Sequence, residues 1–415
     1  MKERQLVIIG GGSGGMAAAI KAYDEGIKDI LILEKDGCLG GILNQCIHNG
    51  FGLTEFKEEL SGPEYLSRFE DEVKKRGIEF KLHSLVTNIT RDKVVTYTNK
   101  EEGVVEIKAQ AIIMATGCYE RNAGAIQIPG DRPKGVITAG TAQKYLNIHG
   151  YLVGKRVVIL GSGDIGLIMA RRMTLEGAKV LCVSEIMPYS NGLQRNISQC
   201  LNDFNIPLYL SHSVSKIVGK EKVEKVVISK VDDHFKFIPG TEMEFECDTL
   251  LLSIGLIPYI SLLENINCPI SSTKGAMVYD NMETFIDGIF ACGNCLHVHD
   301  VVDFVSEEGR NAGHGAALYL KEKEATSSID VKYDKLLSYV VPQKVRIPVK
   351  EDVTLKFRVR REIRNANVIV KSKDQILSQT FKMVMIPSEM VMIKLNKDKL
   401  ANLDDELYVE IVEKK

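Results

Sequence analysis

Three cysteines stand at positions where thiol chemistry could occur. Cys46 is followed two residues later by His48, and a nearby imidazolium lowers the pKa of a thiol. Cys292 and Cys295 have the Cys-x-x-Cys spacing of a redox pair or of half a zinc site. The chain offers no second such pair to complete four ligands, so the sequence predicts no metal. The alternative for all three is a buried cysteine that only packs, and both hypotheses stay open.

Two histidines follow the second cysteine pair. His297 and His299 alternate along the chain, so on an extended backbone both rings face the same side. One of them could donate a proton to a reduced cofactor or to a substrate. A helix is predicted over roughly 302–321, and Asp300 and Asp303 could serve as its caps.

Two further segments have the residue types that bind phosphate. Each places Gly-x-Gly-x-x-Gly between a short apolar run and a helical pattern, with a glutamate 19 residues after the last glycine. Their residues are Gly10, Gly12, Gly15 and Glu34 in the first, and Gly161, Gly163, Gly166 and Glu185 in the second. Two such motifs with the same glutamate offset are a much stronger signal than one.

The chemistry requires these residue types at this spacing. The first glycine allows a tight turn, the second lets the backbone approach a pyrophosphate, and the third lets the helix pack on the strand. N–H groups at the helix start then meet the phosphate charge. Glu34 and Glu185 are predicted to accept hydrogen bonds from ribose hydroxyls. Glu185 also favours NADH over NADPH, because a carboxylate repels a 2′-phosphate.

The elements that position these motifs are predicted strands in which apolar and polar residues do not alternate. The runs Leu6–Ile9, Ile30–Leu33 and Val157–Leu160 are continuously apolar, which is typical of a parallel sheet buried on both faces. Two more apolar runs, Ala111–Gly117 and Gly288–Asn294, end in small turns. The sequence therefore predicts an α/β fold with two Rossmann-like domains.

Composition limits the class of protein. The 415 residues are 45% apolar and 26% charged, with a net charge of −2, which gives no electrostatic case for binding nucleic acid. No segment approaches the roughly 18 apolar residues of a membrane span. Nine cysteines, an odd number, argue against a secreted disulfide framework. The expectation is a cytoplasmic protein.

The last part of the chain differs in composition. None of the 35 glycines lies after residue 330, and residues 331–415 hold 18 Lys and Arg against 12 Asp and Glu. Period-two patterns predict a small antiparallel β domain that is independent of the rest. Lys356, Arg358 and Arg360 alternate there with apolar residues. This basic strand could be solvated, or could dock on an acidic partner or on the acidic body of the chain.

Together these motifs resemble the flavoproteins with two dinucleotide-binding domains, the pyridine nucleotide–disulfide oxidoreductase superfamily, over residues 1 to about 325. The resemblance implies a nicotinamide domain (123–253) inserted in an FAD domain (1–122 and 254–329), followed by the all-β domain (330–415). Disulfide reductases of this superfamily carry two cysteines four residues apart, whereas here Cys46 stands alone. Asn294 replaces an aspartate of the second flavin motif.

The resemblance also implies which residues bind the cofactors. Those for FAD are Gly10, Gly12, Ser13, Gly14, Gly15, Glu34, Lys35, Gly40, Gly41, Val86, Ala115, Thr116, Gly117, Gly255, Gly293, Asn294 and Val302. Those for NAD(H) are Gly161, Gly163, Asp164, Ile165, Gly166 and Glu185. Cys46, His48, His297 and His299 are the catalytic candidates.

Within the superfamily, 40–52, 115–121 and 129–133 are similar to nucleotide-binding subunits of multi-component amine and opine oxidases. Residues 296–303 are similar to flavoproteins found beside an anaerobic-type glycerol-3-phosphate dehydrogenase. The resemblance implies an FAD-dependent NADH oxidoreductase that serves a partner dehydrogenase flavoprotein, and it allows a homo-oligomer. The alternatives are a stand-alone NADH oxidase or thiol-linked reductase using Cys46 or the 292/295 pair, and a nucleotide-binding scaffold without turnover.

Overall fold

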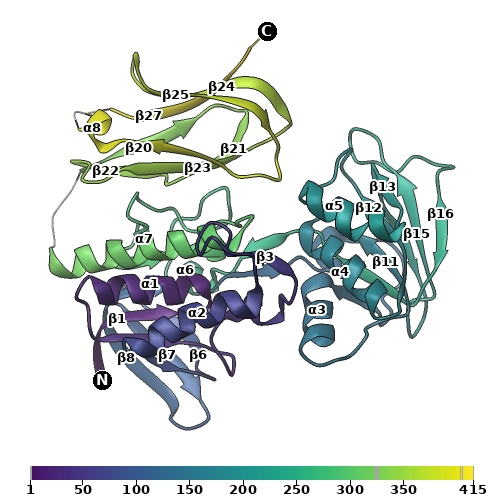
Figure 1. The fold of residues 1–415 in the computed structure, drawn as a ribbon, viewed down its shortest axis with the longest axis horizontal. Coiled ribbons are helices and arrows are strands. Elements are labelled where there is room, and N and C mark those ends of the chain that lie inside the picture. Colours follow the sequence, from purple (N-terminus) through teal and green to yellow (C-terminus); the bar gives the residue numbers. More distant parts are fainter. Residues whose placement is uncertain (1, 323–326, 402, 404, 415) are drawn as a thin grey trace. The chain divides into compact units, whose positions relative to one another are not determined.

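The structure is a computed structural model that describes residues 2–322, 327–401, 403 and 405–414. The chain divides into two compact units. The first comprises residues 1–44, 49–118 and 258–415, and the second comprises residues 45–48 and 119–257. In chain order the second unit therefore interrupts the first, as Figure 1 shows by colour.

A mostly parallel sheet forms the centre of the first unit. Its strands, in spatial order, are β5 (Glu79–Lys81), β2 (Ile30–Leu33), β1 (Lys2–Ile9), β8 (Gly103–Met114), β7 (Val94–Asn99) and β6 (Leu85–Ile89). A late strand, β19 (Ile289–Ala291), pairs in parallel with the last residues of β8. Strands β6 and β7 are antiparallel, so the predicted parallel sheet carries an antiparallel extension. The continuous apolar runs of β1, β2 and the end of β8 are almost fully buried, as expected for the centre of a parallel sheet.

Two helices distant in sequence pack side by side on this sheet, α1 (Ser13–Asp24) and α7 (Val302–Lys321) (Figure 1). Helix α7 has the predicted bounds. A Cβ on Gly309 would lie 2.2 Å from the carbonyl oxygen of Gly14, and one on Gly313 would lie 2.3 Å from that of Ala18. The glycines of α7 therefore allow backbone contact between the helices.

Helix α2 (Gly62–Lys75) also belongs to this unit, and its capping box is formed by Ser61 and Glu64. Short elements complete the unit: β3 (Asn49–Phe51), β4 (Leu60–Ser61) and α6 (Ser261–Asn265).

The second unit repeats the α/β plan. Its parallel sheet has the order β10 (Val136–Thr138), β17 (Thr249–Leu252), β11 (Arg156–Leu160), β12 (Lys179–Glu185) and β13 (Leu208–Leu210). Its helices are α3 (Ala139–Asn147), α4 (Asp164–Leu175) and α5 (Gln194–Cys200). An antiparallel sheet of β14 (His212–Val218), β15 (Lys225–Lys230) and β16 (Met243–Glu246) adjoins it, and β9 (Cys118–Glu120) pairs with β18 (Leu256–Pro258).

The C-terminal residues form a β domain with its own apolar core. One sheet has the order β22 (Lys344–Ile347), β20 (Ser327–Tyr333), β27 (Leu407–Glu413), β24 (Ile363–Ser372) and β25 (Gln375–Met385). The other contains β21 (Leu337–Val341), β23 (Val353–Val359) and β26 (Val391–Leu395), and α8 (Lys397–Leu400) is a single turn. The predicted antiparallel pairing holds for the other described strand pairs of this domain, and β20 and β27 depart from it by pairing in parallel. Adjacent antiparallel strands can be linked by hairpins, whereas these two are separated by most of the domain.

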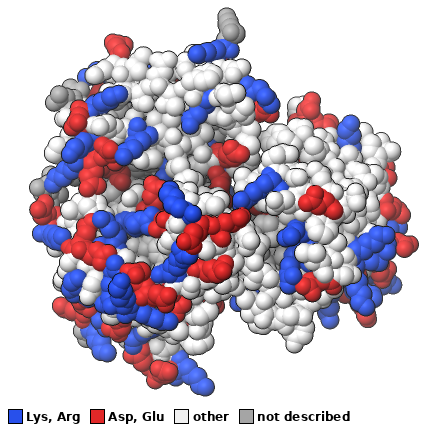
Figure 2. Space-filling model, viewed as in Figure 1, with Lys and Arg blue, Asp and Glu red and all other residues white. Residues whose placement is uncertain are grey.

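Charged side chains of both signs lie on the face of the molecule drawn in Figure 2. Figure 2 shows basic and acidic side chains interspersed on the visible face, in keeping with the net charge of −2. Among the described residues, no helix has both the length and the apolar character required to cross a membrane.

Candidate functional site

The residues predicted to bind FAD meet where β1, β2, β8 and β19 end. The Gly10 N–H donates to Leu33 at 2.9 Å, and the Gly40 N–H donates to Gly11 at 2.8 Å. Ala115 directly follows β8, and its N–H donates to the carbonyl oxygen of Ile9 at 2.9 Å. The Cys292 N–H, next to Gly293, donates to Met114 at 3.0 Å. The first glycine motif, Gly40–Gly41, Ala115–Gly117 and Gly293 thus share one sheet edge, and carboxyl ends of parallel strands are where such folds bind ligands.

The geometry of the first glycine motif fits a dinucleotide. A Cβ on Gly10 would lie 2.4 Å from the Ala115 carbonyl oxygen, and one on Gly15 would lie 1.9 Å from that of Gly10. These two glycines are required by close backbone packing. A Cβ on Gly12 would meet nothing within 4 Å. The open space at Gly12 lies at the start of α1, which has no side-chain cap, so its N–H groups can serve a pyrophosphate.

Glu34 links the loop to the next strand. Its side chain is only 4% exposed; Oε2 accepts from the Gly11 N–H at 2.7 Å and Oε1 accepts from the Asp36 N–H at 2.8 Å. A carboxylate has about four acceptor sites, so ribose hydroxyls can still bind. Lys35 is exposed, beside Asp36. Val86 lies in β6. It is two residues after Ser84, whose backbone N–H donates to the carbonyl oxygen of Glu34.

Two predicted flavin contacts are engaged within the protein. The Thr116 hydroxyl donates to the carbonyl of Tyr259 at 2.7 Å. Asn294 Oδ1 accepts from the His299 N–H at 3.0 Å, and its amide group lies 3.7 Å from the sulfur of Cys118. Asn294 therefore organises its own loop, and Val302 begins α7 just beyond it.

The second motif has the same construction in the second unit. A Cβ on Gly161 would lie 2.0 Å from the carbonyl oxygen of Ser253, and one on Gly166 would lie 2.7 Å from the Ser253 Cβ. Glu185 is 3% exposed and its Oε2 accepts from the backbone N–H and the hydroxyl of Ser162, at 2.8 and 2.7 Å. Gly163 caps α4 without a side-chain hydrogen bond. The loop and α4 together fit a second dinucleotide phosphate.

Asp164 and Ile165, predicted to bind NAD(H), are the first two residues of helix α4. Asp164 Oδ1 accepts from the Leu193 N–H at 2.8 Å and from the Asn196 amide at 2.7 Å. These neutral donors hydrogen-bond the carboxylate at the phosphate end of the helix without cancelling its charge. Gly255 adopts a φ of +101°, and its carbonyl accepts from the Arg121 N–H at 3.0 Å.

The structure places Cys46 and His48 in the second unit, although the sequence assigned them to the FAD domain. Gln45 causes this, because its amide donates to the Gly140 carbonyl at 2.8 Å and to the Gln143 side chain at 3.0 Å. Burial raises the pKa of Cys46 to about 12. Burial, with nearby arginines, lowers the pKa of His48 to about 4. The predicted thiolate–imidazolium pair is therefore not stabilised, and the packing alternative is favoured.

Cys292 and Cys295 are both buried beneath the second flavin segment. The thiol of Cys295 lies 3.1 Å from the Met114 and Cys292 carbonyl oxygens. Burial raises the pKa of both thiols. A reactive cysteine needs exposure and a lowered pKa, so this geometry favours packing over redox chemistry.

His297 and His299 do face the same side, with ring centroids 4.3 Å apart. Both are buried against Glu308 of α7, whose side chain is fully buried. His297 Nε2 lies 2.8 Å from Glu308 Oε1, while His299 Nε2 lies 3.4 Å from Oε2 without forming a hydrogen bond. Burial lowers the pKa of His297 to about 4, so at neutral pH it is an uncharged donor to Glu308.

Glu308 is the centre of this cluster. Its Oε2 accepts from the Gly293 N–H at 2.8 Å, and its Oε1 lies 3.0 Å from the ammonium of Lys356. Burial alone would raise the pKa of Glu308, but the positive charge of Lys356 and the hydrogen bond from His297 outweigh it and hold that pKa well below its usual value. A carboxylate, a buried lysine and two histidines therefore lie directly behind the flavin segment.

The aspartates near α7 do not cap it, so that prediction was wrong. Asp303 accepts from the backbone N–H groups of Gly52 at 3.0 Å and Thr54 at 2.7 Å. Asp300 accepts from the Met390 N–H at 2.7 Å and from the Arg358 guanidinium. Both therefore fasten distant segments of the first unit.

The C-terminal β domain has its own apolar core, and its basic strand takes one of the arrangements that the sequence left open. Lys356 is 3% exposed and contacts Glu308, and Arg358 contacts Asp300, so the basic strand docks on the acidic body of the same unit. Sequence reasoning missed Glu308 and the burial of Lys356 against it. Glu308 could have been noticed as a charged residue on a helix face of small residues. Lys356 could have been noticed as a lysine within a strand of large apolar residues.

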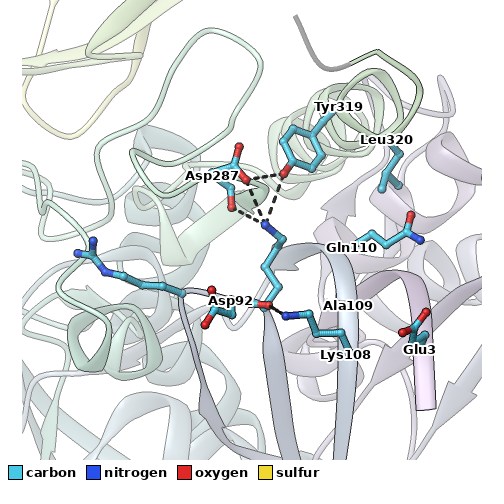
Figure 3. A pocket seen from close by; sticks show the side chains of 10 residues that line it. Glu3, Asp92, Lys108, Ala109, Gln110, Asp287, Tyr319 and Leu320 are labelled. Carbon is cyan, nitrogen blue, oxygen red and sulfur yellow. Dashed lines mark hydrogen bonds and ion pairs between the residues drawn. The ribbon is translucent and has the colours of Figure 1, made fainter. Parts of the chain in front are cut away.

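A separate hollow of about 470 Å³ lies near the amino end of β1, and its lining includes Glu3, Asp92, Lys108, Asp287 and Tyr319. Figure 3 shows Asp287 beside Tyr319, whose hydroxyl donates to it at 2.6 Å. Because nucleotides bind at the carboxyl ends of such strands, this hollow is not the dinucleotide site.

Comparison with known proteins gives a family match over most of the chain. A family model described as pyridine nucleotide-disulphide oxidoreductase matches residues 4–330. An NAD(P)H sulfur oxidoreductase (CoA-dependent) of Pyrococcus abyssi is 26% identical over 72% of this chain and 64% of its own length. A thioredoxin reductase of Bacillus subtilis is 26% identical over 78% of this chain and 97% of its own length. The chain thus spans less than two thirds of the first relative.

A solved structure confirms the predicted fold. The crystal structure of a thioredoxin reductase from T. acidophilum superposes with a TM-score of 0.62 at 24% identity, covering 77% of this chain and 98% of that one. The two Rossmann-like domains, one inserted in the other, are therefore a known architecture.

Proposed function

The chain belongs to the pyridine nucleotide-disulphide oxidoreductase family, and from this premise we propose that it exchanges hydride between NADH and FAD. Members of the family bind FAD and NAD(P)H and are oxidoreductases. The observation that supports this function best is the pair of glycine loops, each held by a buried glutamate, Glu34 in one unit and Glu185 in the other.

The residues of this chain bind and orient the two cofactors. The open space at Gly12 and the uncapped start of α1 receive the FAD pyrophosphate, and Glu34 receives its ribose. Glu185 receives the NADH ribose and repels a 2′-phosphate. When bound, FAD supplies the redox centre that accepts the hydride.

The test is anaerobic reduction of the purified full-length protein. We expect acid precipitation to release FAD, because no histidine or cysteine stands in an attachment motif, and NADH to bleach the flavin faster than NADPH does. Colour retained in the pellet would contradict non-covalent binding. Absent bleaching by either nucleotide would leave only a nucleotide-binding scaffold.

The finer proposal is a role in a multi-subunit dehydrogenase of the glycerol-3-phosphate type. It is supported by the resemblance of residues 296–303 and by the burial of Cys292 and Cys295, which argues against a thiol relay through that pair. We expect slow NADH turnover with oxygen or small disulfides, and faster turnover when the partner dehydrogenase flavoprotein is added. Lys356 and Arg358 are not expected to bind an acidic partner, because both are paired internally.

A thiol-linked reductase is the second candidate. The names of the two relatives above, a sulfur oxidoreductase and a thioredoxin reductase, favour it, and Cys46 lies in the loop that follows Gly40 and Gly41. The raised pKa of Cys46 weighs against it. Rapid reduction of a small disulfide by NADH, abolished by Cys46→Ser, would establish this function in place of the partner-linked one.

A further inference from the structure

We propose that Lys356, in the C-terminal β domain, is a positioning residue for FAD: it keeps the Glu308 carboxylate on the Gly293 N–H and so shapes the second flavin segment. The proposal rests on the proposed function only in that this segment binds FAD.

The contact chain runs from the β domain to the flavin segment in two steps. The Lys356 ammonium lies 3.0 Å from Glu308 Oε1, and Glu308 Oε2 accepts from the Gly293 N–H at 2.8 Å. Gly293 has a φ of +72° and follows β19, so its backbone conformation depends on this hydrogen bond and on the residue being glycine. Removing the lysine charge therefore acts on Gly293 through a single side chain.

Burial makes the lysine charge necessary. Lys356 is 3% exposed and Glu308 is 0% exposed, so water cannot replace either partner. A buried carboxylate without a counter-charge takes up a proton or moves toward solvent. His297 is uncharged at neutral pH because burial lowers its pKa to about 4, and it cannot substitute for the lysine.

The charge of Lys356 also decides between two interpretations of the buried cluster, a cation site and an ion-pair network. His297, His299 and Glu308 lie within 4.8 Å of one another, and residue types of this kind can bind a divalent cation. The ammonium of Lys356 already supplies a positive charge at Glu308 Oε1. A second cation there would be repelled.

Two further side chains of the C-terminal β domain contact the loop that contains His297 and Val298. Tyr339 packs edge-on against His297 with ring centroids 6.0 Å apart, and Arg358 donates to the Val298 carbonyl at 3.1 Å. The family model ends at residue 330, so these contributions come from the part of the chain that the family match does not include. The β domain thus adds a support to the flavin segment that the shared fold does not require.

The test measures FAD affinity of full-length variants by flavin fluorescence, well below each variant's melting temperature. Lys356→Met keeps the aliphatic length and removes the charge, and we expect its Kd for FAD to rise at least tenfold. Lys356→Arg keeps the charge and should stay within about threefold of wild type. Lys394→Met, on the adjacent strand β26, is the matched control, because Lys394 is exposed and pairs with Asp352; its affinity should be unchanged.

Wild-type FAD affinity in folded Lys356→Met would overturn the proposal, and a lower melting temperature with unchanged affinity would show a merely structural role. If that variant does not fold, Glu308→Gln/Lys356→Met removes both charges together and avoids an unpaired buried charge. It should fold and bind FAD at least threefold more weakly, because a neutral amide holds the Gly293 N–H less strongly than a carboxylate. Unchanged affinity would again overturn the idea. A wild type without any FAD affinity would instead refute the proposed function.

Discussion

Two glycines of the first motif should respond to alanine in opposite ways. A Cβ on Gly12 would meet no atom within 4 Å, and Gly12 has a φ of −73°, which alanine adopts freely. A Cβ on Gly15 would lie 1.9 Å from the Gly10 carbonyl oxygen. Gly12→Ala should therefore spare the fold and impair FAD binding, while Gly15→Ala should damage the fold itself.

The size of each effect follows from the geometry. In Gly12→Ala the methyl group occupies the space where the pyrophosphate approaches, and losing one hydrogen bond to a charged group costs about 1.5–3 kcal/mol. That corresponds to roughly 10- to 150-fold weaker FAD binding. In Gly15→Ala the backbone must move by about 1 Å, and such overpacking typically costs about 1–3 kcal/mol or more.

The assay is a pair of measurements on the same proteins. Differential scanning fluorimetry without FAD should show the wild-type melting temperature for Gly12→Ala and a loss of several degrees for Gly15→Ala. Fluorescence titration should then show weakened FAD binding for Gly12→Ala. Wild-type affinity in Gly12→Ala, or wild-type stability in Gly15→Ala, would refute the assignment of these roles.

Three other expectations follow from the site. In stopped-flow experiments, Glu185→Arg should slow flavin reduction by NADH and allow reduction by NADPH, whereas Glu185→Gln should only slow reduction by NADH. A wild-type protein that both nucleotides reduce equally fast would contradict this. Iodoacetamide should label exposed Cys38 and spare Cys46 between pH 7 and 10, because the pKa of Cys46 is raised to about 12 and its thiolate forms only near that pH; mass spectrometry after digestion measures both. A chain ending at residue 329 removes Lys356 from buried Glu308 and should lose FAD or fail to fold, and normal flavin content in the purified truncation would show that the β domain is dispensable.

What could be predicted from sequence was local. The glycine motifs, their glutamates and the helix over 302–321 are specified by residues within about 25 positions of one another, and the structure has them where expected. Glu308 and Lys356 could not be paired in this way, because 48 positions separate them and only the docking of a β domain joins them. Asp303 reaches N–H groups about 250 positions earlier, which no local pattern indicates.

The assignment of Cys46 was missed for a related reason. The residues around it follow the flavin motif in sequence, but the hydrogen bonds of Gln45 attach them to α3 in the other unit. Charge patterning was misleading in the tail as well. Alternation places Lys356 on the polar phase of its strand, but Lys356 is buried there against Glu308, while Thr354 and Arg358 on the same phase are only partly buried.

The late strand β19 has a consequence for how the chain is made on the ribosome. Ile289 pairs with Ile112, so the central sheet of the first unit cannot close until all of the inserted unit has been translated. At about 5–20 residues per second, the interval between β8 and β19 is roughly 10–35 s. During that time one side of the end of β8 is an unpaired apolar edge, which is a template for aggregation. The strands of the inserted unit are synthesised within a shorter interval, so this unit should become protease-resistant first in ribosome-bound chains. The surrounding unit depends on chaperone protection until its closing strand emerges.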